Sequence, residues 1–107
     1  MNNLNSVLIE GRVLAFESFE KDEYIMSIAC RRVDREIRIT IIFKDNVARL
    51  FEAYKETAAG RIIRIVGRID TFGTEPVIYA EHFEWSAAAA AAAQEEAQED
   101  KEGENHQ

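Results

Sequence analysis

Cysteine and proline are nearly absent from this chain of 107 residues, which contains one of each. The single thiol of Cys30 cannot form an internal disulfide, and no Cys/His cluster is present to hold zinc. Because Cys30 lies in an apolar run with strand spacing, we expect a buried, unreactive thiol. The sequence also lacks a nucleophile–base pair and a glycine-rich phosphate loop, so we expect no enzyme, no cofactor and no metal site.

Long hydrophobic runs are missing as well. No stretch is apolar and long enough to span a bilayer, and residues 1–5 contain neither the basic segment nor the apolar core of a signal peptide. We therefore expect a cytoplasmic protein that does not bind membranes. A chain of this length suits a single domain, and so small a domain often gains stability by oligomerisation.

An excess of positive charge, which often marks proteins that bind nucleic acids, is absent too. The formal net charge is -7. Residues 1–86 hold 12 basic and 14 acidic residues, a net charge of -2, and residues 87–107 hold one lysine and six acids, a net charge of -5. A nearly neutral domain can still carry a local basic stripe that follows a phosphate backbone. Nine of the 12 basic residues are arginines, which also stack on planar groups.

Alternating apolar and polar residues predict five β-strands, over residues 5–16, 24–33, 36–44, 61–71 and 77–85. Residues 18–23 and 72–75 are predicted to be a loop and a turn. Between the third and fourth strands, Asp45 or Asn46 suits a helix N-cap, apolar residues recur at helical spacing up to Tyr54, and Gly60 suits the C-terminal cap. This order predicts an all-β (mainly β) fold for residues 1–86, the five-stranded Greek-key barrel called the OB-fold.

The last 21 residues differ in composition from the rest. Residues 87–93 are all alanine, and residues 94–107 are rich in glutamate, glutamine and aspartate. A segment with so little apolar surface to bury is predicted to be a disordered tail. One hypothesis is that its acids imitate phosphates and compete with DNA for basic side chains.

Four stretches follow the strand pattern of a known family, the last of them, residues 77–85, in pattern alone. Residues 5–13 hold three apolar residues, Glu10, and then Gly11 and Arg12; residues 39–43 end in Phe43 just before the helix; and residues 63–69 contain Gly67. Over residues 4–85 the chain resembles the bacterial single-stranded DNA-binding proteins. The resemblance implies a nucleoid-associated homo-oligomer, a tetramer or dimer. It also implies that the protein coats single-stranded DNA in replication, recombination and repair, alongside other proteins of these processes.

The resemblance assigns base stacking to Phe43 and Phe72, at the ends of the third and fourth strands. Every base has a π-face, so such stacking tolerates any sequence. Candidate phosphate contacts are Arg12, Arg31, Arg32, Arg38, Lys44, Arg64 and Arg68.

Some of these residues have a structural alternative. Phe43 shares its parity with Ile41, so it could belong to the core. Arg64 and Arg68 lie on one strand face and could pair with Glu10 or Glu81. Phe19, in the first predicted loop, is expected to anchor that loop, with base stacking as the alternative.

The chain also departs from the family. The family has a long DNA-wrapping hairpin where this chain has only residues 33–35, and an aromatic residue where this chain has Ile37. The tail lacks the apolar tip that docks partner proteins in the family. We therefore expect a weaker DNA binder with a smaller footprint. The alternative function is an OB-fold interaction subunit of a replication-restart or similar assembly.

Overall fold

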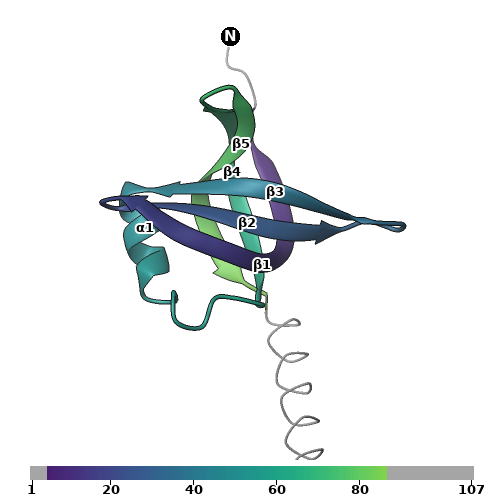
Figure 1. The fold of residues 1–107 in the computed structure, drawn as a ribbon, viewed down its shortest axis with the longest axis horizontal. Helices are drawn as coiled ribbons and strands as arrows, with labels where there is room; N and C mark the ends of the chain where they lie inside the picture. Colours follow the sequence, from purple (N-terminus) through teal and green to yellow (C-terminus); the bar gives the residue numbers. More distant parts are fainter. Residues whose placement is uncertain (1–4, 87–107) are drawn as a thin grey trace, which may run out of the picture.

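The computed structural model describes residues 5–86, which form a closed five-stranded barrel with one helix (Figure 1). In chain order the elements are β1 (Val7–Glu20), β2 (Glu23–Arg31), β3 (Glu36–Lys44), α1 (Asp45–Glu52), β4 (Ile62–Phe72) and β5 (Glu75–Trp85). The order around the barrel is β1-β2-β3-β5-β4, and only the β3–β5 pair is parallel. The predicted OB-fold is confirmed. Residues 1–4 and the predicted tail, residues 87–107, lie outside the described residues.

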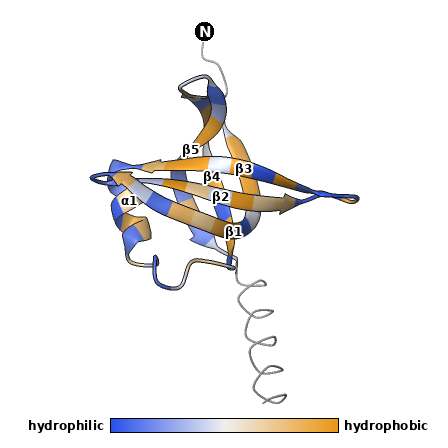
Figure 2. Ribbon diagram, viewed as in Figure 1, coloured by the Kyte–Doolittle hydropathy of each residue, from blue (hydrophilic) through white to orange (hydrophobic). Residues whose placement is uncertain are grey.

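The core lies inside the barrel and under α1. Alternate residues of each strand point inward, and Figure 2 shows the resulting alternation of hydrophobic and hydrophilic residues. The helix contributes Phe51, which is fully buried and contacts the ring of Phe43 with 5.1 Å between ring centroids. The helix thus closes one end of the barrel with an aromatic side chain.

Closure of the barrel depends on β1, which pairs with two strands. Its first half, Val7–Arg12, pairs with β4, and its second half, Arg12–Glu20, pairs with β2. Gly11 lies at this change of partner, where a Cβ atom would come within 2.8 Å of the Ala29 carbonyl oxygen. On β4, a Cβ atom at Gly67 would overlap the carbonyl oxygen of Tyr79. Glycine at these two positions therefore lets neighbouring backbones approach.

The first predicted loop, residues 18–23, is wrong. β1 continues to Glu20 and β2 begins at Glu23, so only Lys21 and Asp22 form the turn. This part of β1 is exposed on both faces, so no apolar alternation marked it as a strand. At the other end of β2, the turn to β3 is Arg32–Arg35, closed by a hydrogen bond of 2.7 Å from the Arg32 N–H to the Arg35 carbonyl.

The helix also differs from its prediction. It ends at Glu52, and its N-cap residue is Lys44, without a side-chain cap, in place of Asp45 or Asn46. The backbone N–H of Asp45 instead donates to the Asp22 carbonyl at 2.9 Å, so the β1–β2 turn satisfies the helix start. Gly60 lies beyond the helix and donates its N–H to the Val13 carbonyl at 2.8 Å. A tertiary contact thus replaces the predicted N-cap, and Ala53 is the C-cap in place of Gly60.

The Gly67→Ala variant is expected to lose about 1–3 kcal/mol of unfolding free energy or more, because overpacking against backbone cannot be relieved by a side-chain rotation. Urea unfolding at 25 °C measures this loss. The control is Thr71→Ala on the exposed end of β4, which should change stability by less than about 0.5 kcal/mol. An equal effect of the two substitutions would contradict the close approach at Gly67.

Candidate nucleic-acid interface

The outer surface of β1, β2 and β3 is built from rows of paired residues. Met26 and Ile28 of β2 point into the core, so Ser27 and Ala29 point outward, although Ala29 is only 5% exposed. The register gives two outward rows, Arg12–Ala29–Arg38 and Ala15–Ser27–Thr40. These six residues are called the β1–β3 face below. Its middle consists of small side chains.

The β1–β3 face is hollowed along β2. One hollow of about 280 Å³ lies at Ala15, Ile25 and Ser27, and a second of about 350 Å³ lies at Arg12, Ala29 and Arg31. A third, of about 460 Å³, lies at the hairpin between β2 and β3. The three hollows follow one another from the middle of β2 to its end. A flat group such as a base can approach the barrel closely here.

Arginines gather at the end of the β2–β3 hairpin, which extends beyond the barrel (Figures 1 and 2). The hairpin cations are Arg31, Arg32, Arg35 and Arg38. Within residues 5–86, none of these four forms an ion pair. Their guanidinium groups are free to make the charge-assisted, bidentate hydrogen bonds that arginine forms with phosphate.

The other predicted cations have carboxylate partners. Arg12 pairs with Glu36 at 3.2 Å, and Lys44 pairs with Glu23 at 3.4 Å. DNA contacts by these residues stay predictions, and each would require replacing a carboxylate.

The alternative assignments of Arg64 and Arg68 are confirmed. Arg64 lies 2.9 Å from Glu10 and 3.3 Å from Glu84, and Arg68 lies 3.4 Å from Glu81. The hydrogen bond from Arg64 to Glu10, together with the charge of Glu10, raises the pKa of Arg64 above its ordinary value. These carboxylates already occupy donor groups that a phosphate would need.

Phe43 lies in the core. Its side chain is fully buried, and its ring centroid is 5.1 Å from that of Phe51 and 5.7 Å from that of Phe83. A base cannot reach this ring in the structure. The structure therefore agrees with the alternative that Phe43, which has the same parity as Ile41, is a core residue. Phe43 is not part of the interface proposed below.

Phe72 is exposed and has an aromatic neighbour. Phe72 is 40% exposed, Phe19 is 37% exposed, and the two rings meet edge to face with 5.5 Å between centroids. Phe19 comes from the end of β1 and Phe72 from the end of β4, so this aromatic pair joins the β1–β2 and β4–β5 turns. The pair lies near the start of β2, and the hairpin cations lie at its end.

Sequence reasoning missed one residue of this arrangement, Arg35, although its place close to Arg31 and Arg32 is a signal of a cationic tip. Phe19 was expected to anchor a loop, and its contact with Phe72 agrees with anchoring. No sequence signal indicated its partner, because the two residues are far apart in the chain.

Cys30 packs against the core from β2. Cys30 is half-buried, and desolvation raises the pKa of its thiol above the ordinary value. A raised pKa leaves less thiolate at neutral pH, in line with the expected low reactivity.

Across residues 5–86 no group of three or more His, Cys, Asp or Glu residues is placed to hold a metal ion. No helix in this range is long and apolar enough to cross a membrane.

Comparison with known proteins finds similarity only at the level of structure. Neither a protein-family model nor a curated protein matches the sequence. A small single-stranded DNA-binding protein from Mycoplasma pneumoniae matches with a TM-score of 0.63 and 21% identity over 77% of this chain and 93% of that one. The Stn1–Ten1 complex of S. pombe gives 0.60 and 18%, over 97% of this chain and 79% of the other.

A third match is the dimeric N-terminal domain of PriB from Thermoanaerobacter tencongensis. Its TM-score is 0.56 at 18% identity, over 78% of this chain and 98% of that one. At these identities the matches establish the OB-fold, and function has to be argued from the residues of the site.

Replacing both members of the Phe19–Phe72 pair should lower the free energy of unfolding by less than the sum of the losses caused by the two single replacements. A double-mutant cycle with Phe19→Ala and Phe72→Ala should show a coupling of about 0.5–1.5 kcal/mol, towards the lower end because both rings are partly solvated. Chemical unfolding provides the measurement. Phe72→Ala combined with Leu50→Ala serves as control and should be additive within about 0.5 kcal/mol. Zero coupling in the aromatic cycle would show that the two turns are not joined through these rings.

Proposed function

We propose that the protein binds single-stranded DNA along the β1–β3 face, from the Phe19–Phe72 pair to the hairpin cations. The observation that carries this proposal is the layout of the surface. Four arginines that form no ion pair within residues 5–86 lie at one end of β2, an exposed aromatic pair lies near the other, and small residues lie between them.

Each part of this surface has a role that follows from its chemistry. The hairpin cations neutralise phosphates and release bound counterions. The exposed face of Phe72 stacks on a base, and the small residues let neighbouring bases lie against the strands. β2 has nine residues at about 3.3 Å each, so the path along it is about 30 Å long. A path of this length suits a short binding site within the range of about 4–16 nucleotides seen for single OB-folds.

The fold supports the same path. In OB-folds, oligonucleotides bind across strands 2 and 3 and the loops between strands 1 and 2 and between strands 4 and 5. Phe19 and Phe72 come from these two connections, and Arg38 lies on the third strand. The Mycoplasma pneumoniae protein that shares the fold is described as a single-stranded DNA-binding protein.

The wider role we propose is coating and protection of single-stranded DNA during replication, recombination and repair. We place the protein in the cytoplasm, at the nucleoid, as a homo-oligomer that works with other proteins of these processes. A domain of this size gains stability by association, and the PriB domain that shares the fold is described as dimeric.

A second candidate function is an interaction subunit in a replication-restart or similar assembly, with weak or no DNA binding. It is favoured by the ion pairs that neutralise Arg12, Lys44, Arg64 and Arg68 and leave the domain without a broad positive field. The Stn1–Ten1 match is to a protein complex. Affinity for a single strand that falls steeply with salt would separate the two candidates, because phosphate contacts depend on ionic strength.

Phe72→Ala should weaken binding of labelled oligothymidylate by about 1–3 kcal/mol, the usual contribution of one stacked base. Fluorescence anisotropy at constant salt measures the affinity, with a duplex of equal length as the weakly bound control ligand. Leu8→Ala, an exposed residue of β1 outside the β1–β3 face, is the matched control and should bind normally. If Phe72→Ala also bound normally, the proposed stacking contact would be incorrect.

Replacing a hairpin cation should change the salt dependence as well as the affinity. Arg38→Gln should reduce the slope of log K against log salt by about 0.7, the value for one phosphate contact on a single strand. Lys55→Gln removes an exposed cation paired with Glu52, remote from the face, and should leave the slope unchanged. Equal slopes for wild type and Arg38→Gln would remove Arg38 from the proposed path.

A further inference from the structure

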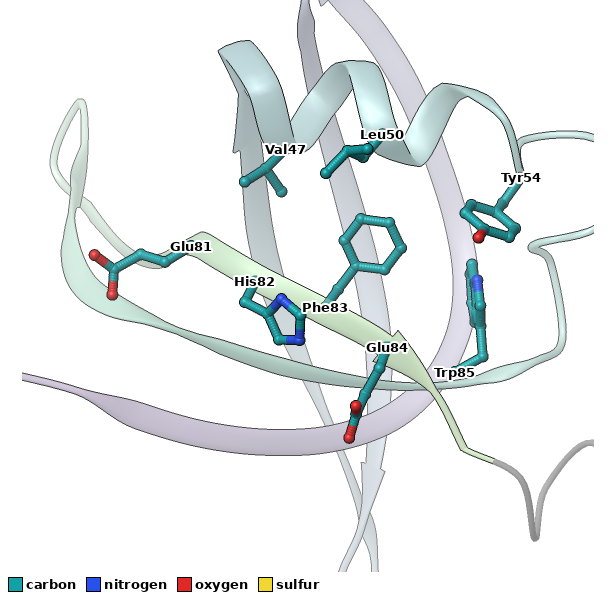
Figure 3. Close-up of a pocket in the computed structure, with 8 residues that line it drawn as sticks. All are labelled: Val47, Leu50, Tyr54, Glu81, His82, Phe83, Glu84 and Trp85. Atoms are coloured by element: carbon teal, nitrogen blue, oxygen red, sulfur yellow. The ribbon is translucent and has the colours of Figure 1, made fainter.

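A groove of about 390 Å³ lies between α1 and the end of β5 (Figure 3). Val47, Leu50 and Tyr54 line it from the helix and the turn that follows, and His82, Phe83 and Trp85 line it from the strand. Leu50 is 64% exposed and Tyr54 is 40% exposed. The volume falls within the range of about 300–1,000 Å³ found for ligand sites. The α1–β5 groove shares no residue with the β1–β3 face.

One wall of the groove is a strand edge without a neighbour. β3 pairs with β5 only at Ile78 and Tyr79, and from Ala80 to Trp85 the strand pairs only with β4 within residues 5–86. The Ser86 N–H donates to the Ile62 carbonyl of β4 at 3.0 Å. Because backbone groups alternate sides in an antiparallel ladder, those of Phe83 and Trp85 point away from β4. An unpaired edge of this kind is a template for an added strand.

The two acidic side chains that line the groove are paired with arginines within residues 5–86. Glu81 pairs with Arg68, and Glu84 shares Arg64 with Glu10. The guanidinium of Arg61 lies over the ring of Trp85, 4.2 Å from its centroid. Residues 87–107, with a net charge of -5, follow directly after Trp85 and Ser86. An occupant of this groove gains from positive charge.

The chain's own C-terminal segment fits the groove poorly. It contains no β-branched residue that would favour an added strand. A segment supplied by another protein is the better match to the edge.

We propose that the α1–β5 groove binds an extended basic segment of a protein partner, which adds as a strand to the free edge of β5. Main-chain hydrogen bonds supply affinity in this mode of recognition, and alternate side chains supply specificity. An apolar side chain of the segment packs against Leu50 and Phe83.

The probe is a synthetic peptide of alternating lysine and valine, titrated into the full-length protein. Trp85 is the sole tryptophan, so its fluorescence reports the groove directly. We expect a saturable change in emission and slower hydrogen exchange at the Phe83 and Trp85 amides. Peptides with proline in place of valine, or glutamate in place of lysine, should produce neither effect, because they lose the strand-forming N–H groups or the positive charge.

Leu50→Gln should weaken binding of the lysine–valine peptide at least about tenfold, the loss expected when a buried contact worth about 1.4 kcal/mol is removed. Leu8→Gln changes an equally exposed leucine on β1 and should bind the peptide as wild type does. Both variants should keep their affinity for oligothymidylate, so failure of the groove proposal is distinguishable from failure of DNA binding. Equal peptide affinity for the two variants, or binding of the proline peptide, would overturn the proposal.

Other occupants of the groove give different results. Replacing the six acids of residues 95–104 with amides in the full chain should weaken peptide binding, because it removes attractive charge. Tighter binding would identify the chain's own tail as the occupant and overturn the proposal. Dissociation of an oligomer by Leu50→Gln in sedimentation velocity would assign the groove to a second copy, with the same consequence.

Discussion

Closure of the barrel through β1 is the constraint on which the rest of this structure depends. β1 pairs with β4 along its first half and with β2 along its second half, and it changes partner at Gly11 and Arg12. The bend brings the end of β1 to the end of β4, which is why Phe19 meets Phe72. The same closure joins β3 to β5 over only two residue pairs, so in the described chain residues 80–85 of β5 keep a free edge beside α1. Both surfaces with a proposed function are consequences of how the barrel closes.

The distribution of ion pairs decides which cations can act on a ligand. On the wall formed by β1, β4 and β5, glutamates on neighbouring strands hold Arg64 and Arg68. At the β2–β3 hairpin, none of the four hairpin cations finds a carboxylate in the described chain. A protein with a net charge of -7 can therefore present a compact cationic end. The position of the cations counts for more here than their number.

Much of the fold could be predicted from the sequence, because inward and outward residues alternate clearly in the strands and the helix lies between the third and fourth of them. The end of β1 could not be predicted, since it is exposed on both faces and carries no apolar pattern. The helix start escaped prediction because its cap is the carbonyl of Asp22, which is distant in sequence. The candidate site was harder to predict from the sequence. The alternation of residues along β3 could not decide whether Phe43 belongs to the core or to the surface. The Phe19–Phe72 contact joins two residues that are distant in the sequence and meet only in the folded chain.

The central claim is that single-stranded DNA lies along the β1–β3 face. Mapping amide chemical shifts while oligothymidylate is added to the labelled full-length protein tests this claim most directly. The account predicts that the largest changes fall on Ser27, Ala29, Arg38 and Thr40, at the hairpin tip and around Phe72, with the residues of the α1–β5 groove unaffected. Changes confined to the groove, or no changes in the presence of excess oligonucleotide, would contradict it.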